Sequence, residues 1–278
     1  MEINPIAFQL GSLAVRWYGI LVTAGFAAGV LVALRVSVKY YRWKEDDILD
    51  FALFLIPAAV IGARAYYVAM SWPEFSGDVW RIFKIWTGGL AVYGGIIAGV
   101  LVAFIYCRVK KKDVWDLLDI GMPAIALGQA IGRWGNFVNQ EAYGRVVSDP
   151  NLQWFPFAVP IQADGQWHYA TFFYESLWCL LIFVFLMFMR KKFRHKGDMA
   201  LSYLLLYGLE RAFVEGLRTD SLYVGPFRIS QVLSMAVVAA VLVFVLVRCL
   251  RERGQSVRIT NKAHPGYLWP PEEPQGAA

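Results

Sequence analysis

Residues 231–247 read QVLSMAVVAAVLVFVLV, a run without a single charged side chain. A helix that crosses a bilayer needs about 20 predominantly apolar residues, and this run with its flanks has that length. The short alternating segments of a β-barrel would look different, because polar and apolar residues would take turns along each strand. The run therefore predicts a membrane-spanning helix over 227–248.

Comparable apolar runs recur back to the start of the chain. Periodicity and helix breakers predict seven spans: 15–36, 47–70, 88–107, 117–137, 170–189, 198–214 and 227–248. The chain is 58% apolar with a mean hydropathy of +0.46, which exceeds the apolar share of a soluble domain. The predicted fold class is all-α, a polytopic membrane bundle of about seven helices in one domain, residues 1–251.

Basic residues indicate the orientation of these spans. Of the 27 lysines and arginines, 18 follow the odd-numbered spans. They are Arg35, Lys39, Arg42, Lys44, Arg108, Lys110, Lys111, Lys112, Arg190, Lys191, Lys192, Arg194, Lys196, Arg248, Arg251, Arg253, Arg258 and Lys262. Positive residues near span ends are retained in the cytoplasm, so the N-terminus is expected outside and the C-terminus inside. The charge of +6 is explained by this topology and by anionic lipid rather than by nucleic acid.

The segments outside the spans are short, with two exceptions. The connection 138–169 is the longest and is expected on the outer side, where it would contribute to function. The tail 252–278 is polar and proline-rich, so it is predicted to be disordered. The first residues lack the basic region and cleavage site of a secretory signal, so the first span is expected to stay in place. The three cysteines have no metal or disulfide spacing.

Five arginines fall inside the spans or at their outer ends: Arg16, Arg64, Arg133, Arg211 and Arg218. An arginine at membrane depth costs at least about 2.5 kcal/mol, so it usually faces the bundle interior and has an anionic partner. Each therefore indicates a polar site or an internal ion pair.

The sixth span carries a polar stripe. Tyr207, Arg211, Glu215 and Arg218 are spaced by four, four and three residues, which places them on one helical face. An Arg211–Glu215 pair that only fixes helix packing would explain the stripe as well as a substrate site would.

The end of the fourth span is more informative. Residues 128–144 read GQAIGRWGNFVNQEAYG. A helix here would put Gln129, Arg133, Asn136 and Gln140 on one face and small glycines on another, where a helix or ligand could approach closely. Asn136, Asn139 and Glu141 follow near the outer interface, where packing alone would favour apolar residues. This cluster predicts a binding site.

Two glycine pairs, at 88–89 and 94–95, flank Tyr93. Exposed N–H groups in such backbone could bind an anion, but small residues also serve helix packing. Tyr18 is a further candidate that on its own is uninformative, because aromatic residues are common at membrane interfaces.

Converging guanidinium groups in the outer half of a membrane suit a phosphate, which arginine binds with two N–H donors. Phospholipid head groups are the phosphates available there. Nearby carboxylates could orient the arginines, accept hydrogen bonds or act as bases. No serine-hydrolase, zinc-protease or Walker motif occurs, which disfavours those classes.

Residues 132–144, GRWGNFVNQEAYG, closely resemble the signature of bacterial prolipoprotein diacylglyceryl transferases. The resemblance extends to RWYG at 16–19, GGLAVYGG at 88–95, FFYE at 172–175 and YGLERAFVEGLRTD at 207–220. It implies an inner-membrane enzyme without a cofactor. Such an enzyme moves the diacylglyceryl group of phosphatidylglycerol to the lipobox cysteine in the signal peptide of a prolipoprotein, forms a thioether and releases glycerol phosphate.

The resemblance implies that Arg133 and Arg211 are the phosphate-side arginines. The other functional positions it implies are Tyr18, Asn136, Glu141, Gly144 and Glu215. From the residues themselves we add four expected substrate contacts: Arg64, Asn139, Tyr207 and Arg218. The expected partners are therefore phosphatidylglycerol, the prolipoprotein and surrounding membrane lipids.

One position departs from the family pattern. Some members have histidine where this chain has Tyr93, and that histidine is proposed to activate the thiol. Tyrosine is a poor base at pH 7, because its ordinary pKa is about 10. Tyr93, Glu141 or a water molecule between them remain as candidates to take the thiol proton.

The rival hypothesis from another class is a lipid transporter or flippase, since buried charges also mark transport pathways.

Overall fold

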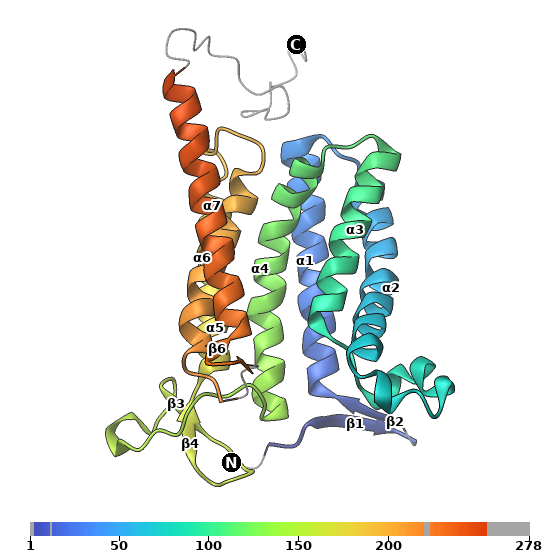
Figure 1. The fold of residues 1–278 in the computed structure, drawn as a ribbon, viewed down its shortest axis with the longest axis vertical. Helices are drawn as coiled ribbons and strands as arrows, with labels where there is room; N and C mark the ends of the chain where they lie inside the picture. Colours follow the sequence, from blue (N-terminus) through green and yellow to red (C-terminus); the bar gives the residue numbers. More distant parts are fainter. Residues whose placement is uncertain (1–2, 12, 220–222, 255–278) are drawn as a thin grey trace, which may run out of the picture. The chain divides into compact units, whose positions relative to one another are not determined.

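The computed structural model describes residues 3–11, 13–219 and 223–254. Its long helices are α1 Trp17–Tyr41, α2 Glu45–Met70, α3 Val92–Lys110, α4 Val114–Asn139, α5 Thr171–Met189, α6 Asp198–Glu215 and α7 Ile229–Gly254 (Figure 1). The predicted spans correspond to these seven helices within a few residues. Most of the predicted tail lies outside the described residues.

Six of these helices are long and apolar enough to cross a membrane. The exception is α6, which carries four acidic or basic residues, Asp198, Glu210, Arg211 and Glu215, in 18 residues. The multi-pass helical character predicted from sequence is thus confirmed. The seven-span count and the orientation stay predictions.

The short elements are three two-stranded antiparallel sheets and four 3-10 turns. The strands are β1 Ile6–Leu10, β2 Leu13–Arg16, β3 Ala158–Pro160, β4 Trp167–Tyr169, β5 Tyr223–Val224 and β6 Phe227–Arg228. The 3-10 turns are η1 Trp72–Glu74, η2 Val79–Phe83, η3 Ile85–Thr87 and η4 Pro150–Leu152. Two isolated β-bridges add to these hairpins, one between Gly144 and Arg218 and one between Val146 and His168.

The chain divides into two compact units, and the boundaries fall within α1 and α4. One unit is residues 34–118, which we call the small unit. The other, the large unit, joins the residues up to Ala33 with those from Asp119 onward.

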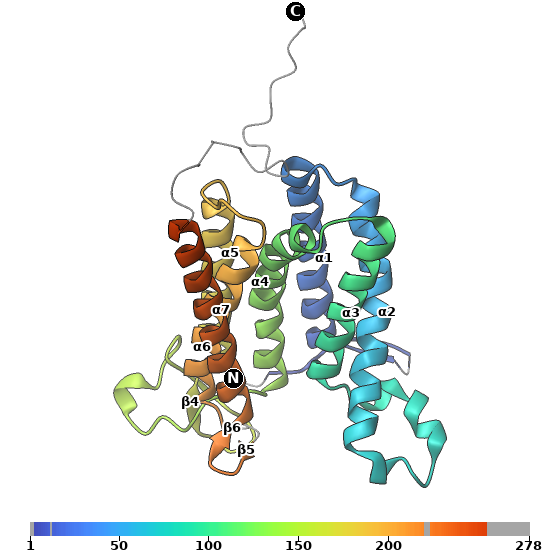
Figure 2. The same cartoon turned by 45° about the horizontal axis from the view of Figure 1, so that its top comes forward.

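In the small unit, α2 and α3 run side by side (Figure 2). A Cβ atom on Gly62 of α2 would lie 2.6 Å from the carbonyl oxygen of Gly94 in α3. Gly94 belongs to one of the glycine pairs, so helix packing explains that pair. At the other end of the two helices, Lys110 pairs with Asp50 at 2.8 Å. Glycine contacts thus set the close approach of α2 and α3, and the exposed ion pair adds little.

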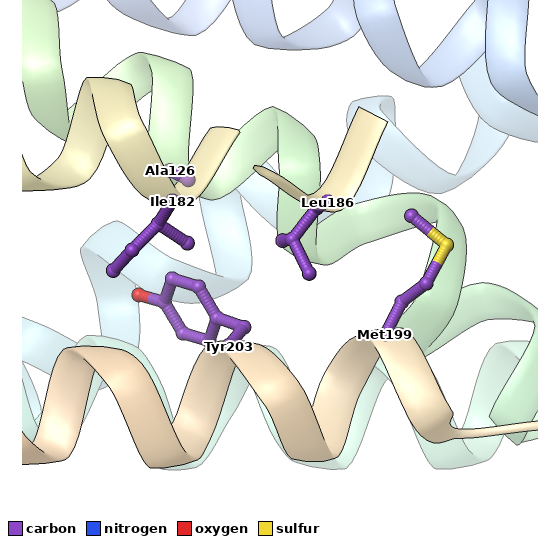
Figure 3. Packing of buried hydrophobic residues seen from close by; sticks show 5 residues of the cluster. All are labelled: Ala126, Ile182, Leu186, Met199 and Tyr203. Atoms are coloured by element: carbon purple, nitrogen blue, oxygen red, sulfur yellow. The ribbon is translucent and has the colours of Figure 1, made fainter. Parts of the chain in front are cut away.

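In the large unit, α4, α5 and α6 enclose a buried apolar cluster. Figure 3 shows its members, Ala126 from α4, Ile182 and Leu186 from α5, and Met199 and Tyr203 from α6. In a membrane bundle such side chains contribute through close packing, because the surrounding lipid is as apolar as they are. This cluster fixes the three helices that carry the charged residues described below.

Asp119 ties the start of α6 to α4. Its side chain is fully buried and accepts hydrogen bonds from the backbone N–H groups of Gly197 at 2.7 Å and Ala200 at 3.0 Å. A carboxylate suits the N-terminus of a helix, where N–H groups lack partners within the helix. The register of α6 against α4 is therefore set by a specific polar contact as well as by packing.

Candidate active site

Glu175 joins two arginines from different helices. Its carboxylate oxygens lie 2.8 Å from Nη1 of Arg133 on α4 and 2.7 Å from Nη1 of Arg211 on α6. Arg211 also pairs with Glu215 at 2.6 Å, one helical turn further along α6. These four residues form the arginine cluster. It contains the Arg211–Glu215 pair predicted from spacing, and it extends that pair to α4 and α5.

The arginine cluster leaves N–H groups for a ligand. A guanidinium carries five N–H donors. Among the described residues, the ion pairs use one nitrogen of Arg133 and two of Arg211. The arginine side chains are 19% and 18% exposed, whereas that of Glu175 is 1% exposed. The carboxylate therefore holds two guanidinium groups that still have donors to bind an anion.

Polar side chains near the arginine cluster contact one another. The Tyr203 hydroxyl donates to Oε1 of Gln129 at 2.8 Å, and the Cys179 thiol lies 3.8 Å from the same oxygen. Tyr207 stacks on Tyr203, with ring centroids 5.4 Å apart and planes 5° apart. Tyr207 also interacts electrostatically with Arg133 and Arg211, and it shares the helical face of Arg211 that the sequence predicted.

The end of α4 brings together three predicted site residues. Nδ2 of Asn136 donates to Oε1 of Glu141 at 2.9 Å, and Nδ2 of Asn139 approaches the same oxygen at 3.4 Å. The helix stops here because Gln140 and Ala142 adopt left-handed backbone conformations, with φ of 54° and 58°. This turn folds the carboxylate back toward the two amides.

Gly144 lies where three segments meet. Its N–H donates to the carbonyl of Tyr169 at 3.0 Å, and its backbone pairs with that of Arg218. A Cβ atom here would lie 2.7 Å from Cβ of Tyr169 and 3.1 Å from Cγ2 of Thr171. Close packing therefore explains a glycine at position 144. The predicted substrate contacts of Gly144 and Arg218 stay predictions.

Tyr18 lies in the first turn of α1 and packs against α4. A Cβ atom on Gly135 would lie 2.8 Å from Cδ2 of Tyr18, so the glycine permits this approach. Tyr18 also interacts electrostatically with Glu141 and Arg133. The large unit thus places Tyr18 beside the residues that the sequence grouped with it.

Arg64 and Tyr93 belong to the small unit, Arg64 on α2 and Tyr93 on α3. The guanidinium of Arg64 donates to five backbone carbonyls in the segment between these helices. They are those of Arg81 at 2.6 Å, Ile82 at 2.8 Å, Gly88 at 2.8 Å, Gly89 at 2.9 Å and Lys84 at 3.5 Å. All five N–H donors are therefore used within the small unit. In this conformation Arg64 organises the 72–90 segment, and its predicted contact with substrate stays a prediction.

Sequence reasoning did not select two acids of the large unit. Glu175 is the one charged residue in α5, and a lone acid in an apolar helix could have been paired with the intramembrane arginines. Glu210 precedes Arg211 on α6 and is 6% exposed. Among the described residues, no three His, Cys, Asp or Glu side chains gather closely enough to hold a metal ion.

Comparisons with known proteins cover most of the chain. Residues 5–247 match the family model described as prolipoprotein diacylglyceryl transferase. The phosphatidylglycerol–prolipoprotein diacylglyceryl transferase of Streptococcus equi subsp. equi (strain 4047) is 44% identical over 258 residues, which cover 91% of this chain and 98% of that protein. The protein of the same name from Clostridium botulinum (strain Langeland / NCTC 10281 / Type F) is 42% identical over 234 residues, 84% of this chain and 92% of that protein. The chain belongs to the prolipoprotein diacylglyceryl transferase family.

Proposed function

We propose that this protein transfers the diacylglyceryl group of phosphatidylglycerol to the lipobox cysteine of prolipoproteins. The names of the relatives supply the two substrates. The observation that carries the proposal is the arginine cluster, because it holds two guanidinium groups around one buried carboxylate with N–H donors to spare.

In the proposed reaction, the cysteine sulfur bonds to the glycerol carbon that carries the phosphate ester. The carbon–oxygen bond breaks, and its electron pair stays on the leaving glycerol phosphate. The phosphate gains negative charge as this bond breaks. Arg133 and Arg211 bind the phosphate and stabilise that charge, which is electrostatic catalysis by preorganised donors.

The thiol proton passes to a base, for which Glu141 and Tyr93 are the candidates. Glu141 is exposed at the end of α4, and two amides contact one of its carboxylate oxygens. Tyr93 is the second residue of α3. Glu141→Gln and Tyr93→Phe each remove one of these groups, and the base is the residue whose loss lowers kcat at saturating phosphatidylglycerol.

We place the site in the outer half of the bacterial plasma membrane. Six span-length helices and the positive charge that follows the odd-numbered spans support this placement. The arginines lie in the second half of α4 and of α6, toward the predicted outer ends of these helices. Both substrates would then enter sideways from the lipid.

The test uses the full chain in lipid nanodiscs with phosphatidylglycerol and a lipobox peptide. Mass spectrometry should find a diacylglyceryl adduct of the peptide and free glycerol phosphate. The double variant Arg133→Gln, Arg211→Gln should lose at least the roughly 10²–10³-fold in kcat that one oxyanion donor contributes. Arg108→Gln, at an exposed position of α3, is the matched control.

Full activity of the double variant would overturn the assigned roles. A folded wild type that binds the lipid without forming any adduct would overturn the transferase proposal. Movement of lipid across the bilayer in that case would indicate the transporter instead.

A further inference from the structure

Glu210 is a buried acid that the proposed reaction does not use. It lies on α6 and is 6% exposed, and neither carboxyl oxygen has a hydrogen-bond partner within the described residues. A buried polar group without partners is unusual in a native structure and calls for an explanation.

Three members of the arginine cluster are neighbours of Glu210. Glu210 interacts electrostatically with Arg133 on α4, Glu175 on α5 and the adjacent Arg211. The Cys179 thiol on α5 also interacts with it. The remaining packed helix, α7, has no titratable side chain between Ile229 and Val247. The arginine cluster therefore dominates the charge around Glu210.

The arginine cluster is already neutral without Glu210. Arg133 and Arg211 supply two positive charges, and Glu175 and Glu215 supply two negative ones. An ionised Glu210 would add a buried negative charge that has no hydrogen-bond partner among the described residues, which is costly. It would also repel the negative charge of an incoming phosphodiester at close range, where little solvent screens the interaction.

We propose that Glu210 is a positioning residue that carries a proton while Arg133 and Arg211 hold the lipid phosphate. This inference rests on the proposed function, because the phosphate it concerns is that of the lipid substrate. The neutral acid leaves the arginines free to pair with the phosphate. Ionisation of Glu210 turns part of their positive charge toward itself and weakens lipid binding.

Proton and lipid binding are then coupled, and the coupling is reciprocal. Phosphatidylglycerol binds best to the protonated form, so its affinity falls as pH rises through the titration of Glu210. By the same linkage, binding of the lipid draws a proton onto the protein. The phosphodiester has no proton to lose in this range, so the proton taken up belongs to the protein.

The experiment measures phosphatidylglycerol binding to the full chain in nanodiscs from mildly acidic to mildly alkaline pH. The wild-type affinity should fall by up to about tenfold per pH unit above the titration of Glu210. Glu210→Gln copies the neutral acid, so it should keep the affinity seen at acidic pH and lose the pH dependence. Asp50→Asn removes an exposed carboxylate of the small unit and should behave as wild type.

A second measurement protects the test against a variant that does not fold. Calorimetry of lipid binding in two buffers of different ionisation enthalpy reports the protons taken up by the wild type. Net uptake is expected with phosphatidylglycerol and none with diacylglycerol, which lacks the phosphate. Equal heats in both buffers would overturn the proposal.

A wild-type affinity independent of pH would also overturn the proposal for Glu210. So would a folded Glu210→Gln protein that keeps the wild-type pH dependence, and so would a folded Glu210→Gln protein that has lost its lipid affinity at acidic pH. In these cases the transfer assay still tests the proposed function separately. A wild type that binds no phosphatidylglycerol at any pH would overturn both.

Discussion

Arg133 and Glu175 are paired at 2.8 Å between α4 and α5, and the glutamate side chain is 1% exposed. The same carboxylate holds Arg211 at 2.7 Å. Two guanidinium groups would repel each other in a buried site without this acid. Glu175 thus makes an arginine pair possible where a membrane would otherwise exclude it.

Replacing Glu175 by Gln should destabilise the protein strongly. The variant keeps the size of the side chain but leaves two buried guanidinium groups short of one negative charge. Breaking a buried ion pair from one side costs about 3–5 kcal/mol. Thermal unfolding in nanodiscs should show a clear fall in Tm together with a loss of transfer activity. Glu252→Gln, which alters an exposed pair with His195, should leave both unchanged. An unaltered Tm for Glu175→Gln would contradict the bridging role.

Replacing Arg211 by Lys should reduce activity although the charge is kept. Arg211 contacts Glu175 and Glu215 through two different nitrogens, at 2.7 and 2.6 Å. A lysine ammonium is a single point of charge and cannot present donors in a planar fork. We expect a loss of at least about tenfold in kcat, the effect of roughly 1.4 kcal/mol. Equal rates for the two proteins would show that charge alone is enough at this position.

Replacing Gly144 by Ala should destabilise the segment after α4. The new methyl group would lie 2.7 Å from Cβ of Tyr169, so the backbone around residue 144 or residue 169 has to shift. Such overpacking typically costs about 1–3 kcal/mol. Hydrogen exchange should become faster across residues 142–170. Gly121→Ala on α4 is the control, because nothing lies within 4 Å of its added methyl group.

Replacing Arg64 by Lys should loosen the 72–90 segment. Lysine has three donors on one nitrogen and cannot reach five carbonyls at once. Losing one hydrogen bond to a charged group costs about 1.5–3 kcal/mol, so opening of the segment should increase roughly tenfold or more. Limited trypsin digestion after Arg81 and Lys84 measures this opening. Arg108→Lys should be digested like wild type, and an Arg64→Lys protein that resists trypsin equally would exclude the organising role.

Acid should loosen the connection between α4 and α5 through Asp164. The backbone N–H of Gln166 and the ring of His168 hydrogen-bond to this carboxylate and hold the pKa of Asp164 below its ordinary value of 3.8. Because the pKa is lowered in the folded state, these contacts stabilise the segment fully above the ordinary value and are lost as pH falls through the lowered one. Hydrogen exchange of residues 161–169, corrected for its intrinsic dependence on pH, should therefore accelerate in acid. Asp164→Asn should remove this change.

The helices could be predicted from sequence because apolar run length decides them almost alone. The predicted span 170–189 is observed as α5, Thr171–Met189, and the span 198–214 as α6, Asp198–Glu215. The ends of the predicted helices follow from helix-breaking and charged residues, which act locally. The division into two units was not predicted, because it depends on contacts between helices rather than on any one helix.

The candidate site could be predicted only where its residues share a helix. Spacing of four placed Arg211 and Glu215 together, and the structure pairs them at 2.6 Å. No spacing connects Arg133 with Glu175, which lie on different helices and meet through tertiary packing. Arg64 shows the converse difficulty, because its partners are backbone carbonyls and these leave no pattern in the sequence.

The bridge through Glu175 also bears on how the chain is synthesised. The ribosome delivers Arg133 first, then Glu175 and finally Arg211, each within a different hydrophobic segment. Arg133 on α4 has no anionic partner until Glu175 on α5 has arrived, whereas Arg211 and Glu215 of α6 pair within their own helix. We expect α4 to wait for α5 before it leaves the insertion machinery. A nascent chain halted between α4 and α5 should remain beside the translocon, whereas one that includes α5 should move into the lipid.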